Sequence, residues 1–223
     1  MSIFLTGSTG FVGINLIKFF RKKTSIYTYE RNSEILIKDK SVIHLAGKAH
    51  DIKKTLSVKE YYEVNTELTK KVFDAFIKSE SKVFIFLSSV KAVADTVEGE
   101  LDENHIANPI THYGKSKLLA EKYIQSIKIP THKRVYILRP CIIHGPGNKG
   151  NLNLLFKLVS KGFPWPLGSF NNKRSFCSID NLLFVINELI INKNISSGVY
   201  NIADDQPLST NEIISLIYKT KNK

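Results

Sequence analysis

The stretch "TGSTGFVG", residues 6–13, lies between the apolar run "SIFL" and the segment "INLIKFF", in which apolar residues recur at helical spacing. Gly7, Gly10 and Gly13 allow a tight turn, close approach of the backbone to a pyrophosphate, and packing of the helix on the sheet. The helix N-terminus would bind the anion through backbone amides. The amides expected to face it belong to Phe11 and Val12. We therefore predict a dinucleotide-binding loop, with a ligand-free tight turn as the alternative.

The rest of the chain alternates short β-branched runs with segments of helical period. Expected strands are residues 2–7, 25–30, 41–47, 82–89 and 134–140, and expected helices are residues 11–23, 64–79, 113–126 and 180–192. Strands that alternate with crossover helices predict a parallel sheet covered on both faces, which is the Rossmann-type doubly wound α/β fold. Such sheets bind ligands beyond the carboxyl ends of their strands.

The sequence changes character at "HGPGNKGN", residues 144–151, where Gly and Pro cluster. The segment "FPWPLGSF", residues 163–170, excludes regular structure. We expect a dinucleotide-binding domain over residues 1–143, with residues 176–193 packing back on it. The remaining residues are expected to form a smaller substrate-binding lobe, composed of residues 144–175 and 194–223.

Composition narrows the function classes. The net charge of +12 suits an anionic partner, but the lysines are scattered without a dense basic block, which argues against nucleic-acid binding. Apolar runs are broken well short of a bilayer span, and the N-terminus lacks the basic start of a signal peptide. Two cysteines, Cys141 and Cys177, show no metal-ligand spacing. We expect a cytoplasmic protein with free thiols, no metal and no integral membrane segment.

The end of the second expected strand carries Glu30 and Arg31 side by side. An acidic residue there binds the adenine ribose hydroxyls of NAD, whereas an arginine accommodates the 2′-phosphate of NADP. The position of Glu30 at the strand end favours NAD, and Arg31 leaves NADP open.

Tyr113 and Lys117 stand four residues apart at the start of an expected helix, so they share a face. An ammonium beside a phenol stabilises the phenolate and lowers its pKa, which would make Tyr113 a general acid/base. Ser89 closes the expected strand "FIFLSS" at the ligand edge, where its hydroxyl could bind the reacting oxygen. Each residue alone fits a structural role, but the three together behind a dinucleotide loop predict an active site.

The motifs "TGSTGFVG", "HLAG", "LSS" and "YGKSK", in this order, resemble the extended short-chain dehydrogenase/reductases, in their nucleotide-sugar epimerase/dehydratase branch. The resemblance implies that Tyr113 is the acid/base, that Lys117 also holds the nicotinamide ribose, and that Ser89 polarises the substrate oxygen. It further implies a set of cofactor-lining residues: Leu45, Ala46, Gly47 and Asn65.

The resemblance also narrows the reaction. The sugar 4,6-dehydratases of this family carry an Asp-Glu pair just after the serine position, whereas this chain has Val90 and Lys91. Two reactions at sugar C4 remain open, namely 4-epimerisation and reduction of a 4-keto sugar. The expected enzyme is a UDP-hexose or UDP-N-acetylhexosamine 4-epimerase of bacterial surface-polysaccharide synthesis. The alternative is an NAD(P)H-dependent reductase of a UDP-4-keto-6-deoxy-hexosamine.

The expected substrate lobe resembles the nucleotide-diphosphate site of the same branch. Asn151 and Leu152 open a helix and would meet the diphosphate and base. Arg174 would bridge phosphate oxygens with its forked donors. The alternative interpretation of Arg174 is an ordinary surface charge.

Two departures from the family pattern keep other interpretations open. Only "RNSEILIKDK", residues 31–40, separates the second strand from "SVIHLAG", where the family has another strand and helix around the adenine. Family members also continue well past the segment matching the chain's end, so the lobe is expected to be incomplete. A non-catalytic cofactor-binding module and a lipid-linked sugar substrate are the further alternatives, and the family resemblance makes a homodimer an expectation.

Overall fold

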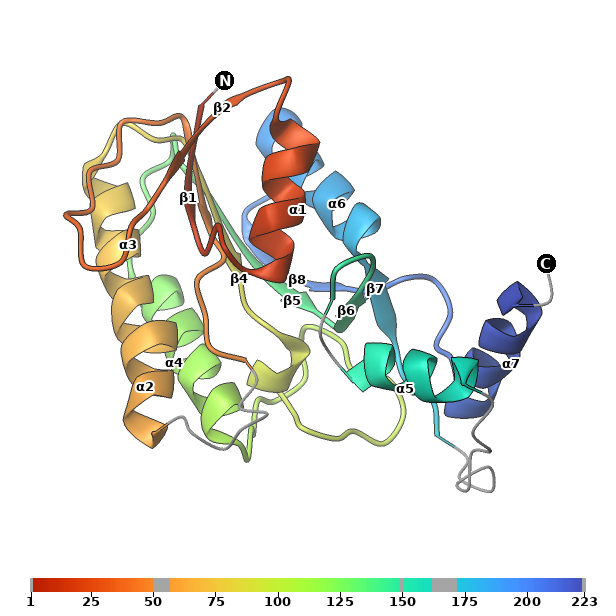
Figure 1. The fold of residues 1–223 in the computed structure, drawn as a ribbon. Helices are drawn as coiled ribbons and strands as arrows, with labels where there is room; N and C mark the ends of the chain where they lie inside the picture. The colour runs from red at the N-terminus through yellow and green to blue at the C-terminus, as the bar shows by residue number, and fades with distance from the viewer. Residues whose placement is uncertain (1, 50–56, 149–150, 162–171, 222–223) are drawn as a thin grey trace.

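In a computed structural model of the protein, residues 2–49, 57–148, 151–161 and 172–221 are described. Figure 1 shows a central parallel sheet between two layers of helices, with a smaller lobe beside its carboxyl edge. The sheet has six strands in the order β2-β1-β3-β4-β5-β8. These strands are β1 (Ser2–Thr6), β2 (Ser25–Thr28), β3 (Ser41–His44), β4 (Val83–Leu87), β5 (Arg134–Pro140) and β8 (Gly198–Ile202). The predicted Rossmann-type fold is confirmed.

The helices divide between the two faces of the sheet. One face is covered by α1 (Phe11–Phe20) and α6 (Ile179–Ile191), and the other by α2 (Val58–Tyr62), α3 (Leu68–Lys78) and α4 (His112–Ser126). A π-helical turn, η1 (Glu63–Glu67), joins α2 to α3, and a 3₁₀ turn, η2 (Val90–Ala92), follows β4. The segment predicted as one helix over residues 64–79 belongs to a longer helical run that begins at Val58, and η1 interrupts its α-helical geometry.

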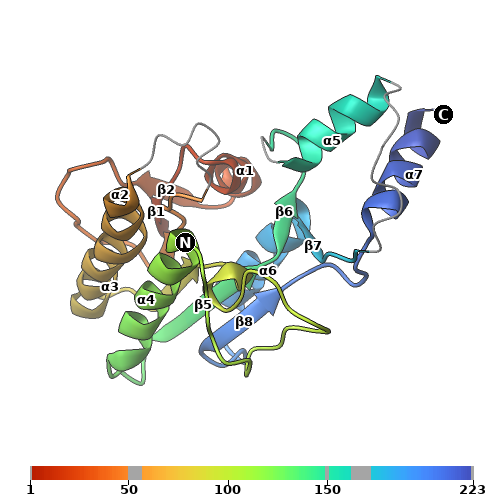
Figure 2. The same cartoon turned by 90° about the horizontal axis from the view of Figure 1, so that it is seen from below.

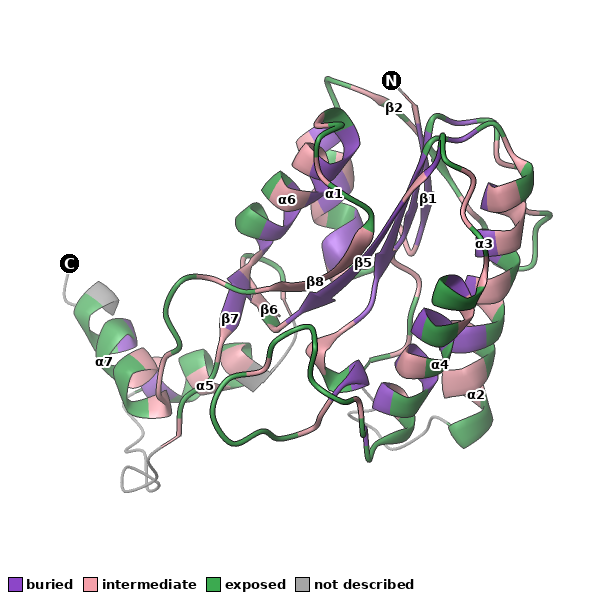
Figure 3. Ribbon diagram, turned by 180° about the vertical axis from the view of Figure 1, so that it is seen from behind, coloured by how far each residue is buried: buried purple, intermediate pink, exposed green. Residues whose placement is uncertain are grey.

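Alternation along the strands builds two separate cores. Ile3 and Leu5 face α1 and α6, whereas Phe4 between them faces α3 and α4. All five residues of β4 are buried, because a central parallel strand is covered on both faces. Figure 3 shows this buried interior along the strands, with exposure concentrated on the outer helix faces.

The strand order places the glycine loop at the point where the chain reverses direction across the sheet. From β1 the chain passes through α1 to β2 on one side, and it then returns past β1 to β3 on the other. Ligands of doubly wound sheets bind at such a switch point. Within the described range 2–49, no helix or strand lies between β2 and β3, so β2 is the edge of the sheet.

The smaller lobe consists of β6 (Ile142–His144), β7 (Phe176–Ser178), α5 (Asn151–Ser160) and α7 (Thr210–Lys221). β6 and β7 form a two-stranded parallel sheet, and α5 packs against α7, as Figure 2 shows. One boundary drawn from the sequence is wrong. Residues 198–202, assigned to the lobe, form β8 and extend the main sheet, because their backbone pairs in parallel with β5.

None of the helices in the described ranges is long and apolar enough to cross a bilayer. Likewise, the described part of the chain contains no group of three or more His, Cys, Asp or Glu side chains that could hold a metal ion. Cys141 and Cys177 are both free thiols.

Candidate active site

The three glycines of the first loop meet different constraints. Gly7 has φ +75°, and a Cβ atom there would lie 2.6 Å from the backbone nitrogen of Ala46. A Cβ atom at Gly13 would lie 2.2 Å from the carbonyl oxygen of Gly7. At Gly10, in contrast, the nearest atom would be the Gly7 carbonyl oxygen at 3.4 Å. The fold itself therefore requires Gly7 and Gly13, whereas Gly10 leaves the backbone open to a ligand.

The N-terminus of α1 is suited to an anion. Gly10 is the N-cap and supplies no side-chain hydrogen bond to the helix. The first turn of α1, all within the described residues, contains no acidic side chain. The first amides of a helix lack intrahelical partners and carry partial positive charge, so Phe11 and Val12 are placed to bind phosphate through their backbone. These features fit a dinucleotide pyrophosphate.

Glu30 and Arg31 lie beyond the end of β2, beside the glycine loop. The backbone amide of Tyr29 donates a 2.8 Å hydrogen bond to the carbonyl of Leu5 and keeps this segment beside β1. Both Glu30 and Arg31 are exposed, and a turn follows in which Asn32 has φ 68°. Both side chains are open to solvent at this edge, and the choice between NAD and NADP stays a prediction.

The loop after β3 meets the start of α4 at Gly47. A Cβ atom at Gly47 would lie 3.0 Å from Lys117 Nζ and 3.2 Å from Asn65 Oδ1. Asn65 is fully buried in η1, and its side chain accepts a 2.8 Å hydrogen bond from the amide of Lys48. π-Helical turns often occur at functional sites. Neighbouring Leu45 and Ala46 line the same edge, with Ala46 in contact with the glycine loop.

The hydroxyls of Ser89 and Tyr113 lie near each other at the carboxyl edge of the sheet, close enough for Ser89 to act on the pKa of Tyr113. Ser89 caps η2 and also accepts a 3.2 Å hydrogen bond from the amide of Lys91. Tyr113 lies in the first turn of α4, which is capped by Thr111. The structure therefore brings together two residues that are 24 positions apart in the sequence.

Lys117 is buried and lies in the next turn of α4. Its ammonium donates a 2.8 Å hydrogen bond to the Leu87 carbonyl and lies 4.7 Å from the centre of the Phe86 ring. Burial lowers the pKa of Lys117 to about 8, and the nearby Glu121 carboxylate acts in the opposite direction. Lys117 can therefore change its charge near neutral pH.

One electrostatic expectation is wrong. The pKa of Tyr113 is raised above its usual value, mainly because burial disfavours the phenolate, although the hydrogen bond from Ser89 acts to lower it. Lys117 is not among the groups that shift the Tyr113 pKa in this structure, and its ammonium is instead bound to the Leu87 carbonyl. In this structure Tyr113 is a neutral hydroxyl, which can donate a proton.

A buried ion pair behind these residues was not foreseen from the sequence. The Arg139 guanidinium, on β5, donates to both carboxylate oxygens of Glu121, with an ion-pair distance of 2.6 Å. Ser88 also donates a hydrogen bond to Glu121. Glu121 follows Lys117 by four positions, and this helical spacing was the available signal.

The predicted substrate residues lie in the smaller lobe. Arg174 is exposed, its backbone pairs with Leu208, and its guanidinium has no hydrogen-bond or ion-pair partner among the described residues. Leu152 is half-buried in the first turn of α5. Asn151 begins α5, but its side chain and the segment 163–170 lie outside the part that the structure describes.

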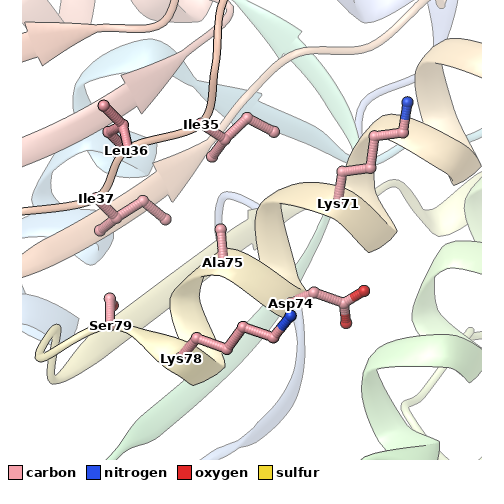
Figure 4. A pocket seen from close by; sticks show the side chains of 8 residues that line it. All are labelled: Ile35, Leu36, Ile37, Lys71, Asp74, Ala75, Lys78 and Ser79. Atoms are coloured by element: carbon pink, nitrogen blue, oxygen red, sulfur yellow. The ribbon is translucent and has the colours of Figure 1, made fainter.

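A separate hollow of about 500 Å³ lies between the irregular segment Ile35–Ile37 and α3 (Figure 4). Lys71, Asp74 and Lys78 line it on the helix side. It extends along α3 to Ser79, which precedes the amino end of β4. Dinucleotide sites lie at the carboxyl ends of the strands, so this hollow is distinct from the candidate active site.

Comparisons with known proteins agree with this geometry. The family model described as "NAD dependent epimerase/dehydratase family" matches residues 3–203. A UDP-glucose 4-epimerase of Vibrio cholerae is 35% identical, over 96% of this chain and 74% of that protein. An N-acetyl-α-D-glucosaminyl-diphospho-ditrans,octacis-undecaprenol 4-epimerase of Escherichia coli O157:H7 is 31% identical, over 100% of this chain and 73% of that protein.

Solved structures share the fold. The UDP-glucuronic acid 4-epimerase of Bacillus cereus in complex with NAD superimposes with a TM-score of 0.86. The match covers 100% of this chain and 84% of that one, at 22% sequence identity. This chain therefore shares the fold of that protein.

Proposed function

Since the chain belongs to the NAD-dependent epimerase/dehydratase family and is a nucleotide-sugar epimerase or oxidoreductase, we propose that it is a 4-epimerase of a UDP-linked hexose or N-acetylhexosamine. The observation that carries this proposal is the convergence of Ser89, Tyr113 and Lys117 on the ligand edge of the sheet. The 4-epimerase relatives supply the reaction type, and the finer substrate assignment is ours.

The proposed chemistry needs a group that moves the proton of the sugar 4-hydroxyl. Tyr113 is placed for this task, because its hydroxyl already meets the Ser89 hydroxyl that would hold the same sugar oxygen. NAD, when bound, supplies hydride acceptance and return at C4. Before it can take the proton, Tyr113 must be ionised, and burial opposes that ionisation. We assign this compensation to the charge of Lys117, although Lys117 is not among the groups that shift the Tyr113 pKa in this structure.

Lys117 would bind the cofactor in addition to supplying positive charge. Its ammonium lies beside Gly47, at the loop proposed to line the nicotinamide end. Gly10, Phe11 and Val12 would bind the pyrophosphate, with Glu30 or Arg31 at the adenosine ribose. Asn65 fixes the Lys48 backbone and the start of α4, so its proposed part in the site is support of the cofactor-lining loop.

Arg174 supports a diphosphate-linked sugar as substrate. It is an exposed guanidinium without a partner among the described residues, and it lies on the lobe just before β7, paired through its backbone with Leu208. Guanidinium binds two phosphate oxygens at once. Leu152 and Asn151, at the N-terminus of α5, are the proposed neighbours of the diphosphate.

The second candidate is a sugar linked through diphosphate to a lipid. The Escherichia coli relative carries that substrate in its name and shares the whole length of this chain at 31% identity. Both candidates need the same chemistry at C4 and differ only beyond the diphosphate. Because the groups that would touch the sugar are common to both, the substrate assay decides between them.

The test incubates the purified protein and NAD with UDP-glucose, UDP-N-acetylglucosamine and polyprenyl-diphosphate-linked N-acetylglucosamine in parallel, followed by chromatographic separation of C4 epimers. Epimer formation from a UDP-sugar supports the proposal. Conversion of the lipid-linked sugar alone transfers the function to the second candidate. Consumption of NADPH with a UDP-4-keto-6-deoxy-hexosamine, without any epimer, replaces the proposal with a reductase. If NAD binds and no sugar is converted, the chain is a cofactor-binding module.

A further inference from the structure

His44 is a fully buried histidine to which the proposed chemistry gives no task. It ends β3 at the ligand edge, and its ring stacks on Phe86 with centroids 5.6 Å apart. Both ring nitrogens meet threonine hydroxyls: Nδ1 lies 2.6 Å from Thr6 Oγ1, and Nε2 lies 2.8 Å from Thr69 Oγ1. Thr6 directly precedes Gly7, and Thr69 lies on α3 after the π-helical turn.

The neighbouring bonds fix which nitrogen carries the proton. The Thr69 hydroxyl donates a 2.8 Å hydrogen bond to the Asn65 carbonyl, so it can only accept from His44 Nε2–H. The Thr6 hydroxyl accepts a 3.2 Å hydrogen bond from the Ala46 amide, which leaves its own hydrogen for Nδ1. The bonds thus run in one direction, from the Ala46 amide through His44 to the Asn65 carbonyl.

The chain of bonds continues through the Asn65 side chain to α4. Asn65 Nδ2 donates a 2.9 Å hydrogen bond to Ser116 Oγ, and Ser116 Oγ donates a 2.8 Å hydrogen bond to the Tyr113 carbonyl. The members of this relay are all fully buried: Thr6, His44, Asn65, Thr69 and Ser116. Inside a protein, such a chain is strong when every member is satisfied and costly when one bond is lost.

We infer that His44 is a positioning residue: as a neutral imidazole protonated on Nε2, it couples the glycine loop and the cofactor-lining loop to the helical turn that carries Tyr113. Its link to turnover rests on the proposed function, but its tautomer and its effect on NAD binding do not. The relay does not touch the reacting atoms. It aligns the two loops that would hold NAD with the residue that would exchange the proton.

The surroundings of His44 keep it neutral. Thr6 on β1, Thr69 on α3 and Phe86 on β4 contact the ring, and Lys117 on α4 is the charged group that acts on it. Burial, reinforced by the charge of Lys117, lowers the pKa of His44 to about 3. A second ring proton would point at the Thr6 hydroxyl, which would have to give up its donated bond. The relay is therefore intact throughout the physiological pH range.

The direct test is ¹⁵N NMR of the imidazole groups in the full chain, with the His44 signals assigned by their loss in a His44→Gln variant. We expect Nε2 to be protonated, Nδ1 to be unprotonated, and neither shift to move between pH 8 and pH 5. Protonation of Nδ1, or titration with a pKa near 6.5, would overturn the inference. This readout needs neither cofactor nor substrate.

A matched pair of variants tests the coupling. Thr69→Val keeps the shape but removes the hydroxyl, whereas Thr69→Ser keeps the hydroxyl. We expect Thr69→Val to weaken NAD binding about tenfold, measured by calorimetry, and Thr69→Ser to recover most of it. If Thr69→Val lowers the melting temperature but leaves the Kd for NAD unchanged, the bonds only stabilise the fold and the inference fails. If Thr69→Val binds NAD more weakly but the wild type converts no sugar, the proposed function fails and the inference about the relay stands.

Discussion

The buried ammonium of Lys117 donates a 2.8 Å hydrogen bond to the carbonyl oxygen of Leu87, the last residue of β4. This bond joins the helix that carries Tyr113 to the strand that leads into Ser89. The bond therefore helps to fix the distance between the hydroxyls of Ser89 and Tyr113, although it involves neither hydroxyl. Lys117 also has a pKa near neutral pH, about 8, so its charge changes within the range in which the enzyme would be assayed.

We predict that turnover depends on the charge of Lys117. Its pKa of about 8 means that the ammonium is almost fully present at pH 7 and below, and is lost as the pH rises through 8. The kcat/KM for the sugar should therefore fall above pH 8, by about tenfold per pH unit at the limit. Lys117→Arg stays charged and should not show this fall, at a lower absolute rate. A wild-type rate that is constant up to pH 10 would contradict this role.

The stability of the fold should depend on His44 in acid. The folded pKa of about 3 lies below the unfolded value of 6.5, so between these values the unfolded chain binds one more proton. Stability should be lost as the pH falls from 6.5 towards 3, by up to about 1.4 kcal/mol per pH unit from this group. Urea titrations at pH 7, 6 and 5 measure it. His44→Gln should flatten the dependence, whereas the exposed control His105→Gln should leave it unchanged.

The glycines should separate folding from ligand binding. Gly7→Ala places a Cβ 2.6 Å from the Ala46 nitrogen at φ +75°, so we expect a loss of roughly 1–3 kcal/mol of unfolding free energy. Gly10→Ala meets only one atom, at 3.4 Å, and should melt close to the wild type. Calorimetry should nevertheless show weaker NAD binding in Gly10→Ala. Equal destabilisation by both substitutions would show that the loop is only a structural turn.

The ion pair between Glu121 and Arg139 should be costly to break from one side. Glu121→Gln leaves the buried Arg139 charge without its counter-ion, which costs about 3–5 kcal/mol in comparable cases. The double variant Glu121→Leu, Arg139→Met removes both charges and should be less destabilised than either single charge loss. Denaturant unfolding of Glu121→Gln, of Arg139→Met and of the double variant measures this. A double variant as unstable as the sum of the singles would contradict a coupled pair.

Arg174 should act on the substrate and not on the cofactor. We expect Arg174→Ala to raise the KM for a diphosphate-linked sugar about tenfold or more, because a charge-assisted contact to phosphate is lost. The Kd for NAD should stay unchanged. The neighbouring Lys173→Ala is the matched control, since it removes the same charge from an exposed site. An equal effect of both variants would show that Arg174 acts only through its contribution to the net charge.

The sequence predicted those parts of the molecule that follow from local pattern. The glycine spacing and the apolar runs predicted the sheet and its switch point, and "RVYILRP" predicted β5 to the residue. The spacing of Tyr113 and Lys117 placed them on one helix face. The strand end placed Ser89 at the ligand edge, whereas its closeness to Tyr113 depends on how β4 and α4 meet.

What the sequence did not predict depends on tertiary contacts. The sign of the Tyr113 pKa shift follows mainly from burial, which residue spacing does not reveal. The strand Gly198–Ile202 was assigned to the lobe because its neighbour in the sheet, β5, lies some sixty residues earlier in the chain. Glu121 has the helical spacing on α4, but its partner Arg139 comes from a strand, β5.

The most direct test of the account is the conversion of a UDP-N-acetylhexosamine or UDP-hexose by wild type and by Tyr113→Phe, with the exposed Tyr27→Phe as the matched control. The account predicts a C4 epimer from the wild type and the control. It predicts a loss of at least about a hundredfold in kcat for Tyr113→Phe, with NAD binding retained. An undiminished rate in Tyr113→Phe would contradict the assignment of the acid/base to this residue.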